Sequence, residues 1–471
     1  MHPRVIIVGG GVAGLAAAYE LTRREVPFQL LEASGRVGGL IRTEQADGFT
    51  IDLGADSMLA QKPAALALCD ELGLGSRLIA TTPPRTAYVY ANDRLHPLPS
   101  PSVFGIPTTD EGVASYDLLP PQARAELQRL ASCADAAIAG EPADDESVAS
   151  FFRRQFGADT VGLIAEPLLG GIHAGDIERL SVRAVAPRLV AAADGHPRGC
   201  ALAALMQTAD QSSSRAADGM FRSFPGGMQE LVDALEGRIP AGSIERHAGV
   251  TDIARDPAGD AGAWHCSTTT DRHRAEAIVI AAPAHSAARM LERVAPVVAR
   301  QCAQVPYVST VSVALAFPRT AIKRPLDGSG FVVARRHAAL RITASTWVSS
   351  KWSGRSPAGM VLLRAFLGGA FDPEAVMLDD DAVIETAMRD LGGVLGIETR
   401  PALARVHRWH NAGAQHWVGH QARAAALDAE LERTPGLFLA GSGYHTLGVP
   451  DCIADGRAAG AAAADYVKMR R

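Results

Sequence analysis

The chain has 471 residues, more than the ~250 to 300 at which a single hydrophobic core stops growing, so we expect two or more domains. Hydrophobic residues make up 47% of the chain, which is ample for genuine cores, and the formal net charge is −5. This charge gives no basic surface for nucleic acid, so nucleic-acid-binding functions are disfavoured.

The cysteines and the apolar runs of the sequence indicate the cellular compartment in which we expect the protein. Six cysteines are scattered along the chain without a C-x-x-C pair or a zinc-like spacing, which predicts reduced thiols and no metal site. The first strand pattern begins at Val5, which leaves no room for a secretory leader. No apolar run reaches the ~18 residues that a spanning helix needs. We therefore expect a cytoplasmic protein with at most peripheral contact at the inner face of a membrane.

The N-terminal stretch "RVIIVGGGVAGLAAAYEL" predicts a buried strand over residues 5–8, a glycine-rich turn and a helix over 15–21. Gly9, Gly11 and Gly14 fit G-x-G-x-x-G, in which the glycines make a tight turn, admit a pyrophosphate and pack the helix against the strand. The phosphates would face the helix N-terminus, whose free N–H groups and positive dipole end favour anions.

The second strand completes this unit. "FQLLE" ends at Glu32, 18 residues after Gly14, close to the ~20 expected for the acid that binds a ribose. The alternative is a glycine-rich turn in an unrelated α/β domain, but strand, helix, second strand and terminal acid are all present. An acid at this place favours a free ribose hydroxyl, and hence FAD or NAD over NADP.

The next segments predict elements that return to the nucleotide. Gly38 and Gly39 follow Arg36, and a strand ending in "IDLGADS" comes back toward the glycine turn. "KPAALALCDELGLG" predicts a helix with a glycine C-cap. "TAYVYANDRLHPLPS" predicts a hairpin that turns at Asn92 and Asp93.

The remainder divides into a helical block, a region rich in strands and a C-terminal unit. Residues 118–217 are mostly helical in pattern and predict a separate insertion, with "SSSRAADG" as its exit linker. "DDDAVIETAMRDLG" predicts a helix with acids in its first turn and a glycine after its last. The chain ends in a strand, a glycine-rich loop and an Ala-rich helix. Strand patterns of a mixed sheet occur at 277–283, 309–317, 330–336 and 359–369.

Several motifs together carry a family resemblance. "GGGVAGL", "LLEASGRVGG", "GADS" and "AGSGYHTLGVPDCIADGRAAG" occur in this order, as in the glutathione-reductase-type flavoproteins with an R-x-G-G segment, the monoamine oxidase and phytoene desaturase relatives. Within that group the chain most resembles the oxygen-dependent porphyrinogen oxidases of haem synthesis. That narrower match is carried by "LHPLPSPSVFGIPT", "EPLLGGIHAGDIERLS", "SFPGGMQELVDAL" and "TWVSSKW".

The resemblance implies an α/β fold with an α+β second domain. It predicts a glutathione-reductase-type, Rossmann-like FAD-binding fold, a mixed-sheet substrate domain and a helical insertion that rests on membranes in some members. We assign FAD binding to residues 1–60, 218–285 and 401–471, the substrate domain to 61–117 and 286–400, and the insertion to 118–217.

The resemblance also implies the residues that hold FAD. Glu32 would bind the adenosine ribose, Val250 would offer backbone on the adenine side, and Trp409 would lie close to the cofactor. The expected FAD contacts are Gly9, Gly10, Gly11, Val12, Ala13, Gly14, Leu15, Glu32, Ala33, Arg36, Gly39, Leu40, Val250 and Trp409, with Gly54, Ala55, Asp56 and Ser57 along the flavin and Gly448, Val449 and Pro450 at the isoalloxazine.

The implied reaction is the aromatisation of a porphyrinogen, either coproporphyrinogen III or protoporphyrinogen IX, in three two-electron steps. Dioxygen would reoxidise the flavin to give hydrogen peroxide, and a ferrochelatase or another enzyme of haem synthesis would be a candidate partner. Two alternatives stay open: another flavoprotein that oxidises amines or desaturates carotenoids, and a binding module without flavin like the Rab GDP-dissociation inhibitors. Fold alone does not choose between them.

Few residues stand out for the chemistry beyond the cofactor, because a hydride transfer needs no nucleophile and base. His173 is the candidate proton acceptor, and its alternative role is that of a polar wall residue. Arg85, Arg94 and Lys351 are candidate propionate partners, although such side chains are usually solvated surface charges.

The sequence departs from many relatives that use protoporphyrinogen at Ala87, where they carry an arginine before the aromatic of the strand. Arg85, two residues earlier, would point to the same face. Two further departures are Ala55 with Asp56 and the "AQH" at residues 414–416. The missing arginine and "HPLPSPSVFGIPT" favour coproporphyrinogen III as the substrate.

Overall fold

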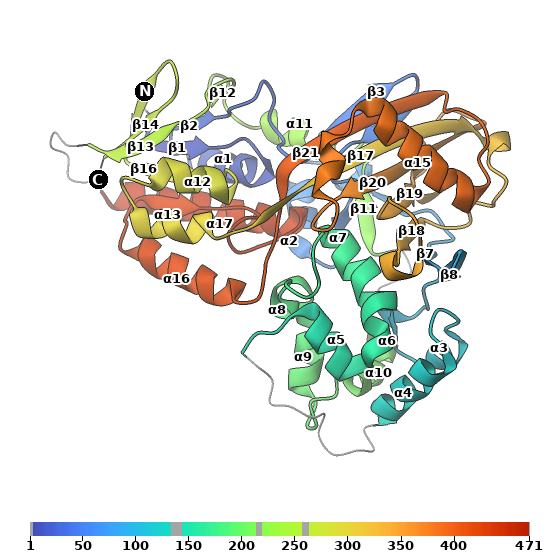
Figure 1. The fold of residues 1–471 in the computed structure, drawn as a ribbon. Helices are drawn as coiled ribbons and strands as arrows, with labels where there is room; N and C mark the ends of the chain where they lie inside the picture. The colour runs from blue at the N-terminus through green and yellow to red at the C-terminus, as the bar shows by residue number, and fades with distance from the viewer. Residues whose placement is uncertain (1–2, 133–143, 213–218, 257–262, 471) are drawn as a thin grey trace.

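The computed structural model describes residues 3–132, 144–212, 219–256 and 263–470. Its body holds two sheets side by side, and a lobe of helices lies below them (Figure 1). The fold is of the α/β type with a mixed second sheet, so the expected fold class is confirmed.

The first sheet carries the N-terminal glycine motif. Its five strands are parallel, in the order β12-β2-β1-β16-β22, so strands from the beginning, middle and end of the chain lie side by side. All four residues of β1 are buried, as its unbroken run of apolar, mostly β-branched residues predicts. The strands are β1 (Val5–Val8), β2 (Phe28–Leu31), β12 (Ile244–Glu245), β16 (Ala277–Ile280) and β22 (Leu437–Leu439).

Helix α1 (Val12–Arg23) packs unusually closely against α17 (Val449–Met469) on one face of this sheet. A Cβ atom added at Gly456 would overlap the Ala13 carbonyl group, and one added at Gly460 would lie 2.7 Å from the Ala17 oxygen. These two glycines therefore let the helix backbones touch. The same core includes α2 (Pro63–Glu71) and α11 (Gln229–Glu236).

The opposite face of the first sheet has its own core, built around Ile6, Ile278 and Trp264. It is covered by α12 (Ala284–Leu291), α13 (Pro296–Ala303) and α16 (His420–Glu432), and by a small antiparallel sheet of β13 (Asp252–Arg255), β14 (Trp264–Ser267) and β15 (Arg272–Ala275).

The second sheet has seven strands in the order β21-β17-β20-β19-β18-β7-β8. Only β18 and β7 run parallel; the other neighbours are antiparallel. Helix α15 (Asp380–Leu395) packs on one face of it. The strands are β7 (Ala87–Ala91), β8 (Arg94–Pro97), β17 (Tyr307–Pro318), β18 (Gly330–Val333), β19 (Ala344–Trp347), β20 (Met360–Gly368) and β21 (Leu403–Ala414).

Short elements connect the two sheets. The hairpin β3 (Thr43–Ala46) and β4 (Phe49–Asp52) packs its Phe49 and Ile51 against the second face of the large sheet, beside Trp352. A three-stranded sheet is formed by β5 (Met58–Leu59), β11 (Phe221–Ser223) and β6 (Ile79–Ala80). Both pieces adjoin the segment at residues 53–57.

The helical lobe has a separate hydrophobic core, and a run of helix from α6 to α7 rises from it toward the large sheet (Figure 1). The middle of this run, η2 (Val161–Gly170), is a π-helix that contains Pro167; proline lacks the N–H that an α-helix would need there. The lobe comprises α3 (Asp110–Ser115), α4 (Pro121–Ser132), α5 (Val148–Phe156), α6 (Ala158–Thr160), η2, α7 (Gly171–His173), α8 (Val182–Val185), α9 (Pro187–Gly195) and α10 (Ala201–Ser212).

Most of the expected elements are present, with differences at several boundaries. The helical region begins at Asp110, earlier than 118, and the expected linker "SSSRAADG" lies largely outside the described residues. Helix α15 continues to Leu395 and closes at Gly396, whose φ is +68°, because Gly392 stays helical. β19 and β21 were not expected as strands.

The sheets also shift two of the expected domain boundaries. The large sheet continues through β21 to residue 414, past the expected end at 400, because β21 pairs with β17. Helices α12 and α13 lie beyond residue 285, yet they pack on the first sheet. The division into domains otherwise stays a prediction.

The cysteines differ from the expectation at one position. Cys69, Cys266, Cys302 and Cys452 are free and buried, as expected of reduced thiols. Cys200 is disulfide-bonded, so the expectation is wrong for this residue; Cys133 lies outside the described residues. Spacing in the sequence gave no signal of this bond.

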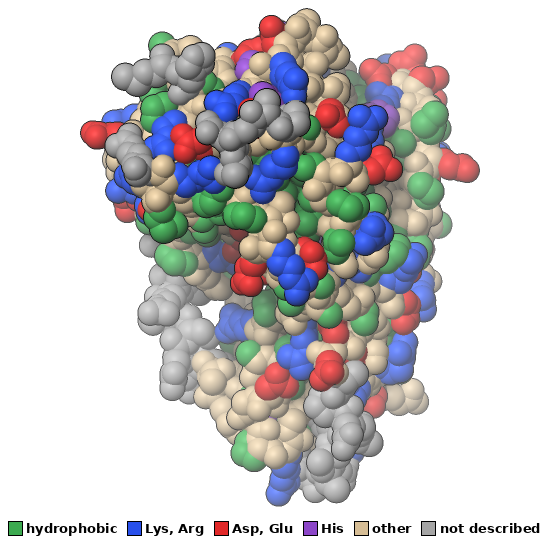
Figure 2. Space-filling view, turned by 90° about the vertical axis from the view of Figure 1, so that its left-hand side faces the viewer, with side chains coloured by type: hydrophobic (Ala, Val, Ile, Leu, Met, Phe, Trp, Pro, Cys, Tyr) green, Lys and Arg blue, Asp and Glu red, His purple; other side chains and the backbone are tan. Residues whose placement is uncertain are grey.

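Within the described residues, no helix is both long and apolar enough to cross a bilayer. Figure 2 shows the side of the first sheet, where acidic, basic and hydrophobic side chains are interspersed. The same part of the chain contains no cluster of three or more side chains suited to hold a metal ion.

Candidate active site

The glycine turn after β1 contains glycines of two kinds. Gly9 has a φ of +104°, and a Cβ at Gly14 would overlap the Gly9 carbonyl oxygen, so the protein itself requires both. Gly11 is different. A Cβ added there would have one neighbour within 4 Å, the Cα of Gly39 at 3.9 Å. The fold does not need a glycine at this position, and its missing side chain leaves an open cradle.

Helix α1 points its N-terminus at this cradle. Gly11 is its N-cap, no side chain caps it, and its first turn contains no acidic residue. The first N–H groups of a helix have no partner within the helix. Those of α1 are therefore available to an anion, which the helix dipole also favours.

Glu32 lies at the end of β2, beside the glycine turn. Its Oε2 accepts a hydrogen bond from Gly10 N at 2.6 Å, and its Oε1 accepts from Ser34 N at 2.8 Å and Ser34 Oγ at 2.7 Å. An ionised carboxylate offers about four acceptor sites, so one remains for a ligand. The Glu32 carbonyl oxygen accepts from Ala248 N at 2.8 Å, which brings the segment containing Val250 alongside.

The R-x-G-G segment forms the next wall. Gly38 N donates to the Gly10 carbonyl oxygen at 2.8 Å, and Gly39 has a φ of +57°. The Arg36 guanidinium donates to the carbonyl oxygens of Gly39 at 2.6 Å and Ile41 at 3.0 Å. Arg36 therefore holds the loop in shape. Ala33 and Leu40, two other expected contacts, are exposed.

Residues 54–57 run beside this loop. Ala55 N donates to the Leu40 carbonyl oxygen at 3.3 Å, and a Cβ at Gly54 would overlap that same oxygen. Trp409 on β21 donates from Nε1 to the Leu53 carbonyl oxygen at 3.0 Å. The structure thus brings Trp409 to the expected flavin segment from a strand more than 350 residues away.

Asp56 in this segment is held by two cations. Lys351 Nζ lies 2.9 Å and Arg364 Nη2 3.7 Å from its Oδ2, while Ser57 Oγ donates to Oδ1 at 2.8 Å. Burial alone would raise the pKa of Asp56, but the charges of Lys351 and Arg364 outweigh it and hold the pKa well below its usual range. Lys351, an expected propionate partner, is therefore paired within the protein.

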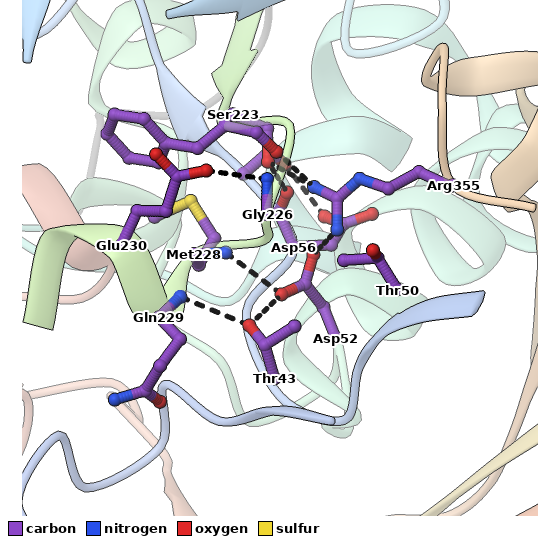
Figure 3. Close-up of polar contacts among 12 residues, drawn as sticks. Thr43, Thr50, Asp52, Asp56, Ser223, Gly226, Met228, Gln229, Glu230 and Arg355 are labelled. Carbon is purple, nitrogen blue, oxygen red and sulfur yellow. Dashed lines mark hydrogen bonds and ion pairs between the residues drawn. The ribbon is translucent and has the colours of Figure 1, made fainter. Parts of the chain in front are cut away.

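A polar network around Asp52 and Asp56 holds the same segment in place (Figure 3). Arg355 is fully buried and binds Asp52 Oδ2 from Nη1 at 2.9 Å, while its Nη2 donates to Ser223 Oγ at 2.9 Å. Ser223 Oγ in turn donates to the Asp56 carbonyl oxygen at 2.8 Å, and Asp52 Oδ1 accepts from Met228 N at 3.0 Å. The motif "SFPGGMQE" therefore holds residues 52–56, next to the expected flavin segment, in place.

Sequence reasoning missed Arg355, Arg364 and Asp52. Arg364 donates to the carbonyl oxygens of Asp52 and Gly54, the latter at 2.9 Å. One signal for Arg364 was present: a charged residue in the apolar run "VLLRAFL", since a buried charge needs a partner.

The C-terminal unit supplies the other wall. A Cβ at Gly441 would meet only the Ala13 Cβ, at 3.7 Å, so this turn also lies open beside α1. Gly448, with a φ of +89°, precedes α17, which begins at Val449 and Pro450. Two long helices therefore begin around one region, and both begin at a glycine that no side chain caps.

His173 lies at the end of α7, where the π-helix run meets the body. Gln415 Nε2 donates to its carbonyl oxygen at 2.9 Å. Burial lowers the pKa of the His173 imidazole to about 4, with smaller contributions from the charges of His416 and Lys62. His173 is therefore neutral near pH 7, and its lowered pKa makes it a weaker base than an exposed histidine.

The two expected arginines lie apart. Arg85 precedes β7, so strand alternation with Ala87 does not apply to it, and its Nε donates to the Thr81 carbonyl oxygen at 3.0 Å. Its segment adjoins Lys351, whose carbonyl oxygen accepts from Thr82 N at 3.0 Å. Arg94 lies on β8, 69% exposed and paired with Asp117 of the lobe.

These features fit a dinucleotide of the FAD type. The open cradle at Gly11, the uncapped start of α1 and the remaining acceptor site of Glu32 match a pyrophosphate and a ribose. Residues 12–466 match the sequence profile of flavin containing amine oxidoreductases. The chain belongs to this family. The expected family and the expected cofactor, FAD, are thereby confirmed.

Individual members of the family resemble the chain over its whole length. It is 34% identical to a coproporphyrinogen III oxidase from Bacillus subtilis, over 98% of each chain. It is 26% identical to protoporphyrinogen oxidase 2 of Arabidopsis thaliana, over 96% of this chain and 92% of the other. A solved structure from Exiguobacterium sp., assigned to protoporphyrinogen oxidases, superposes over the full length of both chains with a TM-score of 0.86 and 29% identity.

Proposed function

We propose that this chain is an FAD-dependent oxidase that converts coproporphyrinogen III to coproporphyrin III in haem synthesis, and that protoporphyrinogen IX is a poorer substrate. The observation that carries the proposal is the 34% identity to a coproporphyrinogen III oxidase over 98% of both chains. The lower identity to a protoporphyrinogen oxidase, 26%, and the alanine at position 87 support the preference.

The proposed reaction removes six electrons and six protons from the macrocycle. Three molecules of dioxygen take them up and leave as three molecules of hydrogen peroxide, so the reaction is balanced. When bound, FAD supplies the hydride acceptor. The chain supplies binding, orientation and the exclusion of water.

We assign these tasks to the residues of the site. The amides at the start of α1 and the open cradle at Gly11 bind the pyrophosphate, and Glu32 binds the ribose. Residues 54–57, held by Lys351, Arg364 and Arg355, form a rigid wall along the flavin. His173, neutral at the pH of the cell, is the candidate for accepting a proton at its imidazole.

The setting in the cell is part of the proposal. We place the protein in the cytoplasm with at most peripheral membrane contact, through the helical lobe, and we regard a ferrochelatase as a candidate partner that consumes the porphyrin once formed. Fractionation tests the first point: salt or carbonate should release the protein from membranes, and a requirement for detergent would contradict it.

The holoenzyme tests the proposed activity. Purified protein should be yellow and release FAD on denaturation; colourless protein that cannot be reconstituted would point to a binding module without flavin. Each porphyrinogen is then mixed with the holoenzyme without oxygen. Coproporphyrinogen III should bleach the flavin, and admitted oxygen should restore its colour and yield coproporphyrin. Bleaching by amines and by neither porphyrinogen would refute the proposal.

A further inference from the structure

A small cavity lies where the π-helix η2 meets the large sheet. Its walls come from the end of η2, from the strand β18 with the turn after it, and from the end of β20. Four of its lining residues are glycines, Gly170, Gly171, Gly175 and Gly368, so backbone rather than side chains forms much of the surface. The cavity adjoins α7, which ends at His173.

One ion pair stands in this cavity. Arg335 Nε lies 3.0 Å from Glu166 Oε1, and the two side chains are 31% and 8% exposed. Glu166 Oε2 is buried and has no hydrogen-bond partner among the described residues. Burial raises the pKa of Glu166, although the charges of Arg335 and Arg336 oppose the shift. This carboxylate is therefore protonated more readily than an exposed one.

Arg335 also has unused capacity. A guanidinium has five N–H donors in a planar fork, and within the part of the chain that the structure describes the Glu166 pair is its only polar interaction. Its flat face stacks on Phe371, with 3.7 Å between Cζ and the ring centroid. This stacking holds the guanidinium at the cavity, where a planar anion can bind in a bidentate manner.

The expected propionate partners are less suitable. Lys351 is taken by Asp56 at 2.9 Å, and Arg94 stands on the surface beside Asp117. The cavity is small, with room for little more than a water molecule or a carboxylate group. It therefore suits a side arm of a tetrapyrrole better than the whole ring.

From this geometry we propose that Arg335 binds a propionate of the porphyrinogen and that the cavity receives that arm. The proposal rests on the proposed function, because it needs a substrate with carboxylate arms. Glu166 then acts as a positioning residue: it holds Arg335 in place and carries the charge against which the propionate competes.

Four variants of the holoenzyme test this: Arg335→Gln, Glu166→Gln, the double variant Arg335→Gln with Glu166→Gln, and Arg336→Gln as control. Arg336 is exposed and next in sequence, so it matches the charge and the position. The double variant guards against misfolding, since it leaves no unpaired charge in the cavity. Thermal unfolding of each protein checks that it is folded.

The readout is the Kd of coproporphyrin III and of its tetramethyl ester, with kcat/KM for coproporphyrinogen III beside it. Arg335→Gln and the double variant should weaken coproporphyrin III about tenfold or more, as expected for a hydrogen bond between charged groups. The ester, which has no carboxylate, should bind them about as well as it binds the unchanged protein. Glu166→Gln should bind coproporphyrin III as well or more tightly, and Arg336→Gln should change it less than about twofold.

The outcomes separate the two claims. Equal losses for acid and ester in Arg335→Gln, or a loss in Glu166→Gln as large as in Arg335→Gln, would show a structural role and overturn the inference. Unchanged binding in the double variant would do the same. If the unchanged protein oxidises neither porphyrinogen, the proposed function itself fails.

Discussion

Replacing Gly11 by alanine should abolish tight FAD binding and leave the fold intact. A Cβ there would have one neighbour, 3.9 Å away, and the φ of −66° at Gly11 is one that alanine adopts without strain. The same change at Gly14 would put a methyl group onto the Gly9 carbonyl oxygen. The two variants therefore distinguish a glycine kept for the ligand from a glycine kept for the fold.

The magnitudes follow from these surroundings. In the protein without flavin, Gly11→Ala should change the free energy of unfolding by no more than about 1 kcal/mol, the scale of an N-cap substitution. Each hydrogen bond lost to the charged pyrophosphate is worth about 1.5 to 3 kcal/mol, so the Kd of FAD should rise by roughly 10- to 150-fold for every bond lost. Gly14→Ala should cost about 1 to 3 kcal/mol or more of stability through overpacking.

The assay uses protein prepared without flavin. FAD is titrated while flavin fluorescence is followed, and denaturant unfolding without FAD gives the stability of each variant. The unchanged protein and Gly14→Ala serve as references for binding and for folding. Gly11→Ala that binds FAD with the original Kd, or that loses several kcal/mol of stability without FAD, would refute the assignment of the pyrophosphate to this cradle.

Three further predictions follow from the site and the cores. Glu32→Ala should raise the Kd of FAD by roughly 10- to 150-fold, because the ribose loses a charged acceptor; an unchanged Kd in the same titration would remove this carboxylate from the site. Burial lowers the pKa of His416 to about 4 and of His420 to about 3, so the unfolded chain binds protons below pH ~6.5 that the folded chain does not. The free energy of unfolding should therefore fall as the pH drops from about 6.5 to 4, by up to about 1.4 kcal/mol per pH unit for each histidine. Urea denaturation across this range measures it, His420→Gln should flatten the slope, and a slope that does not change would contradict the reasoning. Gly456→Ala should destabilise the protein by about 1 to 3 kcal/mol because its Cβ would overlap α1, whereas Gly393→Ala, with open space around it in α15, should stabilise it by about 0.5 to 1 kcal/mol. If Gly456→Ala and Gly393→Ala shift the Tm in the same direction, this would be evidence against the helix contact inferred at Gly456.

The sequence by itself determined the parts of the protein whose contacts are local. Gly9, Gly11, Gly14 and Glu32 lie within a single βαβ unit, and the hairpin turn at residues 92–93 needs only its own neighbours. Backbone sterics, helix dipoles and strand alternation act over a few residues, so patterns and spacings are enough to read them. Together with motif order, they gave the fold class, the cofactor and the family.

Only the tertiary structure decided how distant charges pair. Asp56 and Lys351 are 295 positions apart, and Asp52 and Arg355 are 303 apart. Nothing in the sequence indicates that Lys351 forms an ion pair with Asp56, or that Arg335 forms one with Glu166 at a cavity. The pairing of buried charges depends on which groups lose their water together, and that is set when separate sheets and helices pack. The charge of a side chain can be read from the sequence. Its partner, and therefore its function, depends on which groups are buried together when the sheets and helices pack.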